Sequence, residues 1–445
     1  MRTICLYFEI HQIIHLKRYR FFDIGADHYY YDDYANETGI NEVAERSYIP
    51  ALNALIEMVK NSGGGFKVAL SISGVALEQL EIHAPAVIDL LHVLNDTGCC
   101  EFLAEPYSHG LSSLANEDCF REEVMRQSDK MKQMFGKAPK VFRNSSLIYS
   151  DEIGGLVASM GFKGMLTEGA KHVLGWKSPN FVYTNVMNPR LKLLLKNSRL
   201  SDDLTLRFSD HSWHEWPLTA DKYARWLKDS TQDSEIVNLF MNYETFGENQ
   251  LAETGIFEFM RSLPEYIFST TDFEFLTPSE AVKKHQPVAP LHVPYPISWA
   301  DEEKDITGWL GNELQNEAFE ELFKIQPKVE ALNDPELNED YSRLQASDHF
   351  YYMRTKLFSD NDYHRYVSPY ETPYEAFINY MNVLSDFVAR VEDMEKMRNI
   401  AGNKITEEEK SSEKKKRTPR VKSAESAAKA TKKVSTKEKQ VKSKH

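Results

Sequence analysis

The sequence has few cysteines and none of the patterns that bind zinc. Four cysteines occur among 445 residues, at positions 5, 99, 100 and 119. They form no CxxC pair and no Cys/His cluster, which argues against a structural zinc site. Cys99 and Cys100 are adjacent in the chain, and adjacent cysteines rarely form a disulfide with each other. Free thiols suit a reducing compartment, so we expect a cytoplasmic protein without a metal or other cofactor.

Long hydrophobic runs are also absent. No stretch of about 18 apolar residues occurs, and the sequence therefore predicts no membrane span. At the N-terminus the apolar run covers only Ile4 to Phe8, and Glu9 and His11 interrupt it. It is too short for the core of a signal peptide and predicts a buried strand instead.

An excess of positive over negative charge occurs at the C-terminus, whereas the rest of the chain is acidic. The formal net charge is −14, but Lys404–His445 carries 15 Lys/Arg and 6 Asp/Glu, a net charge of +9. This segment has almost no large apolar residues, which predicts a disordered basic tail over 401–445. The tail either contacts a polyanion weakly or serves only to keep the protein in solution. The acidic remainder disfavours nucleic acid as a partner of the folded part.

Aromatic residues are abundant, at 12%, with 22 Tyr and 24 Phe. Carbohydrate sites stack aromatic rings against sugars, so the enrichment is compatible with a sugar-binding protein. A large aromatic core explains the same composition, and composition alone favours that explanation.

Short apolar strands alternate with helical stretches over residues 1–290, which predicts a parallel sheet closed or covered by helices. The predicted strands are Thr3–Phe8, Lys67–Ile72, Cys100–Leu103, Val141–Phe142, Gly164–Leu166, Leu191–Leu195 and Ile236–Met241. The predicted helices include Ile40–Asn61, Ala84–Thr97, Asp118–Phe135, Ser150–Met160, Ala220–Asp229 and Gly255–Leu263. Polar residues follow several strand ends directly, where barrels of this type build their active sites.

The pattern changes after about residue 290, where four segments predict amphipathic helices. These are Trp299–Glu321, Ile325–Leu332, His349–Leu357 and Pro373–Met397. We expect a helical C-terminal region that packs against the barrel.

Five segments, spread over most of residues 1–390, resemble glycoside hydrolase family 57. They begin at Tyr7-Phe8-Glu9-Ile10-His11-Gln12, Phe102-Leu103-Ala104-Glu105-Pro106, Val141-Phe142-Arg143-Asn144, Leu239-Phe240-Met241-Asn242-Tyr243-Glu244 and Phe358-Ser359-Asp360-Asn361-Asp362-Tyr363-His364. Ile13 stands where the family's opening motif usually has proline. The resemblance implies a retaining α-glucan hydrolase of the α-amylase type. It implies an α/β fold with an incomplete seven-stranded (β/α) barrel over 1–290, a helical C-terminal domain over 291–400 and the tail over 401–445.

The two catalytic carboxylate positions of that family hold neutral residues here. Aligning the third segment without a gap puts Ser146 where active members carry the glutamate nucleophile. In the fourth segment, Asn242 stands where they carry the aspartate acid/base. An asparagine amide has no proton to donate near neutral pH, and a serine hydroxyl is a poor nucleophile without an adjacent base.

Other residues of the matched segments are candidates for substrate binding, and each also has a purely structural explanation. They are His11, Glu105, His109, Arg143, Trp213, Asp362 and His364. Glu244 is the alternative acid/base, because it would share a face with Asn242 if the strand continued to it; a carboxylate that only orients its neighbours is the competing explanation. Asp360, Asp362 and His364 match no strong metal-binding motif.

Three functions remain open from the sequence. The first is a catalytically impaired α-amylase homologue, a pseudoenzyme of carbohydrate metabolism that binds an α-glucan or maltooligosaccharide. The second is an active hydrolase that uses a relocated carboxylate such as Glu244, and the third is a non-catalytic scaffold. The sequence does not predict the oligomeric state.

Overall fold

In the computed structural model, which describes residues 1–230, 233–356 and 368–416, seven parallel strands build the wall of a barrel. They are β1 (Arg2–Ile10), β2 (Val68–Ile72), β3 (Cys100–Phe102), β4 (Val141–Arg143), β5 (Gly164–Thr167), β7 (Lys192–Leu195) and β8 (Ile236–Asn242). Two sheets contain them, in the orders β3-β2-β1-β8 and β4-β5-β7. Single parallel bridges, Ala104–Phe142 and Lys196–Asn238, join the sheets on either side. The expected seven-stranded α/β barrel is confirmed.

Three further strands are short and were not predicted. β6 (Tyr183–Asn185) runs antiparallel to β7, β10 (Pro290–Leu291) pairs with β6, and β9 (Phe273–Phe275) pairs with the start of β1. All three lie outside the segments that resemble the family, which include or adjoin the equally short β3 and β4.

Side chains of the central strand β1 alternate between two buried layers. Cys5 and Tyr7 belong to the cluster inside the barrel, whereas Ile4 and Phe8 belong to the outer core between the strands and the helices. Both faces are buried because helices cover the parallel sheet, which is why these strands appear in the sequence as continuous apolar runs. By the same alternation, Glu9 faces the barrel interior.

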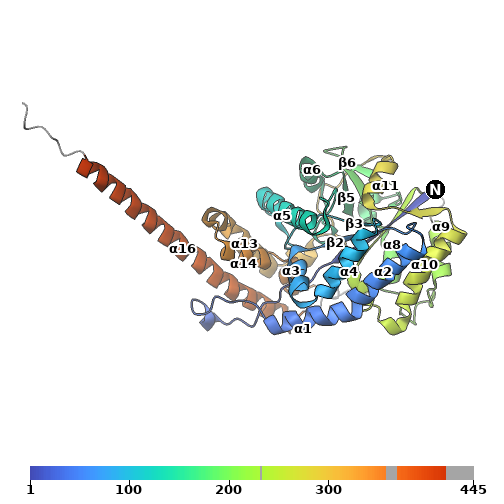
Figure 1. The fold of residues 1–445 in the computed structure, drawn as a ribbon, viewed down its shortest axis with the longest axis horizontal. Helices are drawn as coiled ribbons and strands as arrows, with labels where there is room; N and C mark the ends of the chain where they lie inside the picture. Colours follow the sequence, from blue (N-terminus) through green and yellow to red (C-terminus); the bar gives the residue numbers. More distant parts are fainter. Residues whose placement is uncertain (231–232, 357–367, 417–445) are drawn as a thin grey trace, which may run out of the picture. The chain divides into compact units, whose positions relative to one another are not determined.

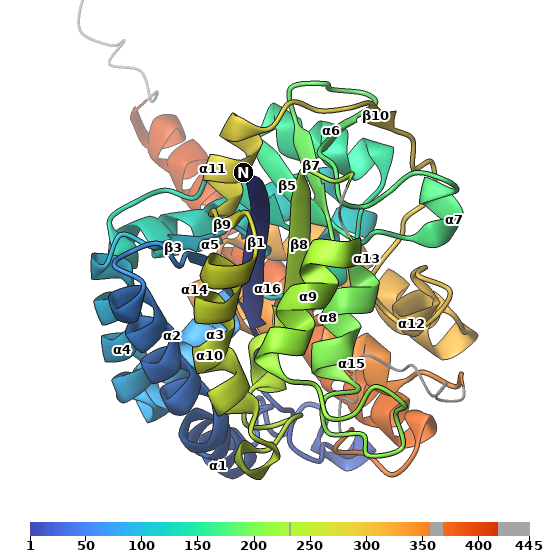
Figure 2. The ribbon, with the colours of Figure 1, turned by 90° about the vertical axis from the view of Figure 1, so that its right-hand side faces the viewer.

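Helices cover the outside of the barrel (Figure 1). They are α1 (Asp33–Val43), α2 (Ile49–Asn61), α3 (Gly74–His83), α4 (Pro85–Asp96), α5 (Glu117–Phe135), α6 (Asp151–Ser159), α7 (Lys171–Leu174), α8 (Ser198–Thr205), α9 (Ala220–Ser230), α10 (Ile256–Thr270) and α11 (Pro278–Lys284). Figure 2 shows α9 and α10 lying over β1 and β8, which run side by side. The helix predicted over Ile40–Asn61 is instead α1 and α2 joined by a π-helical turn at Ala44–Tyr48.

The C-terminal region is helical, as expected, with boundaries that differ from the prediction. It contains α12 (Thr307–Leu310), α13 (Glu313–Leu332), α14 (Pro335–Leu344), α15 (Ser347–Tyr352) and α16 (Pro373–Lys416). The helix predicted over Trp299–Glu321 is wrong at its start, because the backbone at Asp301 and Lys304 has positive φ and no helix forms before Thr307. The segment predicted at Ile325–Leu332 is the second half of α13.

The predicted disordered tail begins too early. α16 continues to Lys416, through a stretch rich in Glu and Lys, which are good helix formers. Residues 417–445 lie outside the described residues.

Residues Met1–Arg390 form one compact unit and Val391–His445 a second. The boundary predicted at residue 290 therefore lies inside the first unit. Within it, the loop after β1 is fixed to α16, since Asn379 Oδ1 accepts the backbone N–H of Tyr19 at 2.7 Å and Asp386 accepts the hydroxyl of Tyr30 at 2.6 Å. Among the described helices, none is long and apolar enough to cross a membrane.

Candidate active site

Charged side chains gather at the carboxyl ends of the barrel strands. Each comes from a different strand or from the first three residues after it, and each is almost fully buried: Glu9, Glu105, Arg143, Glu168 and Lys196. We call these five residues the polar ring. Buried charges are stable only when paired, and the ring pairs them internally.

Arg143 bridges two carboxylates of the ring. Its Nη2 lies 2.5 Å from Glu9 Oε1, and its Nη1 donates to Glu105 Oε2 at 3.0 Å. Burial raises the pKa of Glu9 to about 7, although Arg143 acts in the opposite direction, and burial likewise raises the pKa of Glu105. A single guanidinium therefore pairs with two carboxyl groups whose pKa values are raised by burial.

Two histidines lie against this pair. The rings of His11 and His109 stack with centroids 4.0 Å apart, and His109 Nε2 lies 3.3 Å from Glu9 Oε1. His11 Nε2 lies 2.9 Å from Asp348 Oδ2. Burial lowers the pKa of His109; for His11, the effect of burial is outweighed by Asp348, and the pKa is raised. The two shifts favour a proton on His11 rather than on His109, and His11 pairs with Asp348 at the start of α15.

The other side of the ring is also charged. Lys196 Nζ lies 3.1 Å from Asp202 and 4.0 Å from Glu168, and Lys304 lies 3.9 Å from Glu168. Ser198 donates its hydroxyl to Glu168. Burial would lower the pKa of Lys196, but its acidic neighbours raise it, so the lysine stays charged.

Ser146 lies in a 3₁₀ turn directly after β4 and is buried, with a backbone φ of +52°. Its carbonyl oxygen accepts the backbone N–H of Trp299 at 3.1 Å. Its hydroxyl has no hydrogen-bond partner among the described residues. The structure therefore brings Ser146 to the barrel mouth, one turn beyond Arg143.

Asn242 ends β8, and the chain then forms a 3₁₀ turn at Tyr243–Thr245. The assumption that the strand continues to Glu244 is therefore wrong. Glu244 accepts the hydroxyl of Tyr48 and, at 3.1 Å, the amide of Gln12. Burial raises the pKa of Glu244 to about 7.

Glu9 and Glu105 are the carboxylates that sequence reasoning did not pair. One oxygen of each lies within 4.8 Å of the other and of a ring nitrogen of His109, a grouping that also suits a metal ion. Retaining hydrolases place their two carboxyl groups about 5–5.5 Å apart. Here, however, the guanidinium of Arg143 is bonded to both carboxylates and takes the place that an anomeric carbon or a cation would need.

The remaining candidates are not part of the polar ring. Trp213 packs against the outer core, where its ring contacts Trp226 and Arg207, so the structure does not group it with Arg143. Asp362 and His364 lie outside the described residues. Sequence reasoning missed Asp348 and Trp299, since neither lies in a matched segment and no local pattern links them to the barrel.

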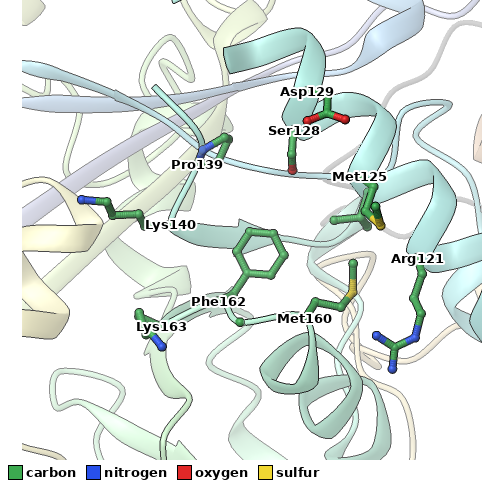
Figure 3. A pocket seen from close by; sticks show the side chains of 11 residues that line it. Arg121, Met125, Ser128, Asp129, Pro139, Lys140, Met160, Phe162 and Lys163 are labelled. Carbon is green, nitrogen blue, oxygen red and sulfur yellow. The ribbon is translucent and has the colours of Figure 1, made fainter. Parts of the chain in front are cut away.

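A cavity of about 470 Å³ lies away from this site (Figure 3). It is formed by α5 and by the turns that precede β4 and β5, at the amino ends of those strands. Its lining combines methionines and Phe162 with basic side chains, including Arg121, Lys140 and Lys163. The cavity is separate from the barrel mouth, where the carboxyl ends of the strands meet.

The model of the family described as "Glycosyl hydrolase family 57" matches residues 5–294, well over half of the chain. The chain belongs to glycosyl hydrolase family 57. It is a carbohydrate-active protein of the α-amylase-like type.

Comparisons with individual proteins agree with this result. A protein of Methanocaldococcus jannaschii named "Putative alpha-amylase" is 40% identical over 376 residues, which cover 82% of this chain and 79% of that protein. The fold is similar to that of a family 57-type branching enzyme from Pyrococcus horikoshii, with a TM-score of 0.62, 12% identity and coverage of 89% and 94%. It is also similar to 4-alpha-glucanotransferase from Thermococcus litoralis, with a TM-score of 0.61 and 15% identity; the match covers 78% of this chain and 56% of that one.

Proposed function

We propose that this protein binds an α-glucan or maltooligosaccharide in the barrel mouth and is catalytically impaired. The observation that carries the proposal is the pair of neutral residues, Ser146 and Asn242, at the two positions that the family uses for its carboxylates. The protein's membership of family 57 and the names of its relatives support an α-glucan as the ligand.

The chemistry of the site supports impairment. Retaining hydrolysis needs one carboxylate to attack and a second carboxyl group to protonate the leaving oxygen. Asn242 can do neither, and the Ser146 hydroxyl has no base within hydrogen-bonding distance among the described residues. Glu9 and Glu105 are both held by Arg143 rather than facing an open space between them.

Capacity to bind sugar hydroxyls remains. Glu9 Oε2, Glu105 Oε1 and Ser146 Oγ are buried, and no described residue forms a hydrogen bond with them. Buried polar atoms without partners cost roughly 1–3 kcal/mol each, so a ligand that bonds to them recovers that free energy. Sugar hydroxyls, which both donate and accept, suit such a set of oxygens.

Isothermal titration with maltotriose and maltoheptaose tests the proposal. We expect binding by the wild type, at least tenfold weaker binding by Glu105→Gln, and no change for Glu152→Gln, an exposed residue of α6 that serves as the matched control. No heat of binding at millimolar ligand would count strongly against the proposal.

A second candidate function rests on Glu244. With its pKa raised to about 7, this carboxyl group could donate a proton at neutral pH, as a general acid must. Hydrolysis of an activated maltoside by the wild type, lost in Glu244→Gln, would favour this function over the first. Activity that survives the substitution excludes Glu244 as the essential acid.

A further inference from the structure

Trp299 lies on top of the polar ring. Its side chain belongs to the cluster of apolar residues inside the barrel and is 2% exposed. Two cations of the ring face the indole: the Arg143 guanidinium is 5.2 Å and the Lys196 ammonium 5.4 Å from the ring centroid. The backbone N–H of Trp299 is bonded to Ser146. The indole thus lies over both halves of the ring and beside the position of the missing nucleophile.

The segment that carries Trp299 is held down by polar contacts rather than by regular secondary structure. We call Ser298–Lys304 the Trp299 segment. Its ends are joined by a hydrogen bond from the N–H of Ser298 to the carbonyl of Lys304, at 3.1 Å, and Lys304 Nζ donates to the carbonyl of Trp299 at 3.0 Å. Asp301 is paired with Arg354 and Lys356, at 3.5 and 3.2 Å.

Part of the backbone of this segment is strained. Asp301 and Lys304 have φ values of +37° and +54°. Residues with a side chain seldom adopt such values; Asp tolerates them better than most, so the strain falls mainly on Lys304. Strain of this kind costs of order 1–3 kcal/mol per residue and persists only where contacts hold it. The ion pairs of Asp301 and Lys304 are such contacts, and their loss would release the segment.

The closed arrangement leaves hydrogen-bonding capacity unused. The Ser146 hydroxyl, next to the Trp299 backbone, is buried without a hydrogen-bond partner among the described residues, as are oxygens of Glu9 and Glu105. A sugar ring has both an apolar face and hydroxyls, and would satisfy these atoms. The indole, with its single N–H donor, cannot satisfy several oxygens at once.

We propose that Trp299 is the gate of the barrel mouth: its indole fills the space above the polar ring, and a glucosyl residue reaches the ring only when the Trp299 segment moves away. This inference rests on the proposed function for the identity of the ligand, but not for the closure itself. Because closure competes with binding, removal of the indole increases ligand affinity.

A thiol introduced by Ser146→Cys measures the closure without any sugar. The substitution is nearly isosteric, and a Cys100→Ser background removes the one cysteine that is not fully buried; the other three are buried. We expect slow labelling of the introduced thiol by a methanethiosulfonate reagent, and labelling at least tenfold faster when Trp299→Ala is added. Labelling at the rate of an exposed thiol with Trp299 in place would overturn the proposal, as would no acceleration on its removal.

Titration with maltoheptaose separates the gate from the proposed function. Tighter binding by Trp299→Ala than by the wild type supports the gate, whereas weaker binding makes Trp299 a stacking platform and overturns it. If neither protein binds but the introduced thiol becomes accessible on removal of the indole, the gate stands and the glucan proposal fails. If neither change occurs, both fail.

A second variant covers the case in which Trp299→Ala does not fold. Lys304→Ala keeps the indole and removes the contacts of Lys304 with the Trp299 carbonyl and Glu168. In the Ser146→Cys background, we expect it to speed the labelling of the introduced thiol at least threefold. As a control, Lys324→Ala removes an exposed lysine of α13 and should leave the labelling rate unchanged; an equal effect of both lysine variants would contradict the proposal.

Discussion

Glu9 of β1 and Asn242 of β8 are register partners on neighbouring parallel strands. Register partners lie about 4.8 Å apart and direct their side chains to the same face of the sheet. A carboxyl group at position 242, which is half-buried, would therefore stand beside the buried Glu9. Both burial and the like charge would raise its pKa, which is the condition that a general acid needs.

Restoring both carboxylates should create a hydrolase. We expect Ser146→Glu combined with Asn242→Asp to hydrolyse maltoheptaose at least 100-fold faster than the wild type, as measured by released reducing ends. Because the two groups act as a unit, each single variant should gain little. A double variant no faster than the single variants would show that the alignment of these positions, or the openness of the mouth, is wrong.

Replacing Arg143 should destabilise the protein. Arg143→Met leaves Glu9 and Glu105 buried without their shared cation, at a cost of about 3–5 kcal/mol near pH 8. Both carboxyl groups have raised pKa values in the folded state, so they can take up protons as the pH falls, and the loss should be smaller at pH 5. Urea denaturation at the two pH values measures this. Adding Glu9→Gln should restore part of the stability at pH 8, and its failure to do so would contradict the pairing.

The ion pair between His11 and Asp348 should stabilise the fold within a defined pH range. The pKa of His11 is raised, so its contribution is full below about 6.5 and is lost as the pH rises through the folded value. The pKa of Asp348 is lowered from 3.8, so its contribution is present above that value and is lost as the pH falls. Asp348→Asn should therefore lower the free energy of unfolding most between about pH 4 and pH 6.5, by on the order of 3 kcal/mol.

Thermal denaturation at pH 5.5 and pH 9 tests the His11–Asp348 prediction. The difference in melting temperature between the wild type and Asp348→Asn should be smaller at pH 9 than at pH 5.5. Asp221→Asn, which breaks an exposed pair with Arg225, should have no measurable effect at either pH. A deficit that is equal at both pH values would mean that Asp348 contributes through packing rather than through charge.

Glu244→Gln should stabilise the protein at alkaline pH. The pKa of Glu244 rises from 4.5 to about 7 on folding, so the folded state binds more protons in between, and stability falls as the pH rises through this range. Glutamine removes that cost while it still accepts hydrogen bonds from Tyr48 and Gln12. We expect the free energy of unfolding to rise by roughly 2 kcal/mol at pH 8 and to stay unchanged at pH 4, where the carboxyl group is protonated in both states. The figure at pH 8 is below the full effect of the pKa shift because the side chain is partly exposed.

The barrel could be predicted from the sequence because its strands are buried on both faces. Mainly apolar runs such as Ile4–Phe8 and Ile236–Met241 mark such strands, and the predicted ends differ from the observed ones by at most two residues. β6 and β10 were missed because they are short and, unlike the equally short β3 and β4, neither lie in nor adjoin a segment that resembles the family. The helix predicted at Trp299 failed because contacts distant in sequence, such as Asp301 with Arg354, fix a non-helical backbone there.

The candidate site was only partly visible in the sequence. Motif positions identified His11, Glu105, His109 and Arg143, which the structure brings together. Nothing local connects Asp348 to His11, since they lie in different regions of the chain and meet only when α15 packs on the barrel mouth. Glu9 stands in a matched segment, but its bond to Arg143 follows from strand order and side-chain alternation, which become certain only once the barrel is closed.

The two bridges that join the sheets have a mechanical consequence. Ala104–Phe142 directly precedes Glu105 and Arg143 in the chain, and Lys196–Asn238 includes Lys196 itself. One bridge contributes fewer hydrogen bonds than a full ladder, so the wall resists widening least along these two seams. At the first seam, Arg143 of one sheet pairs with Glu9 and Glu105 of the other, so these buried ion pairs supply cohesion that the short ladder lacks.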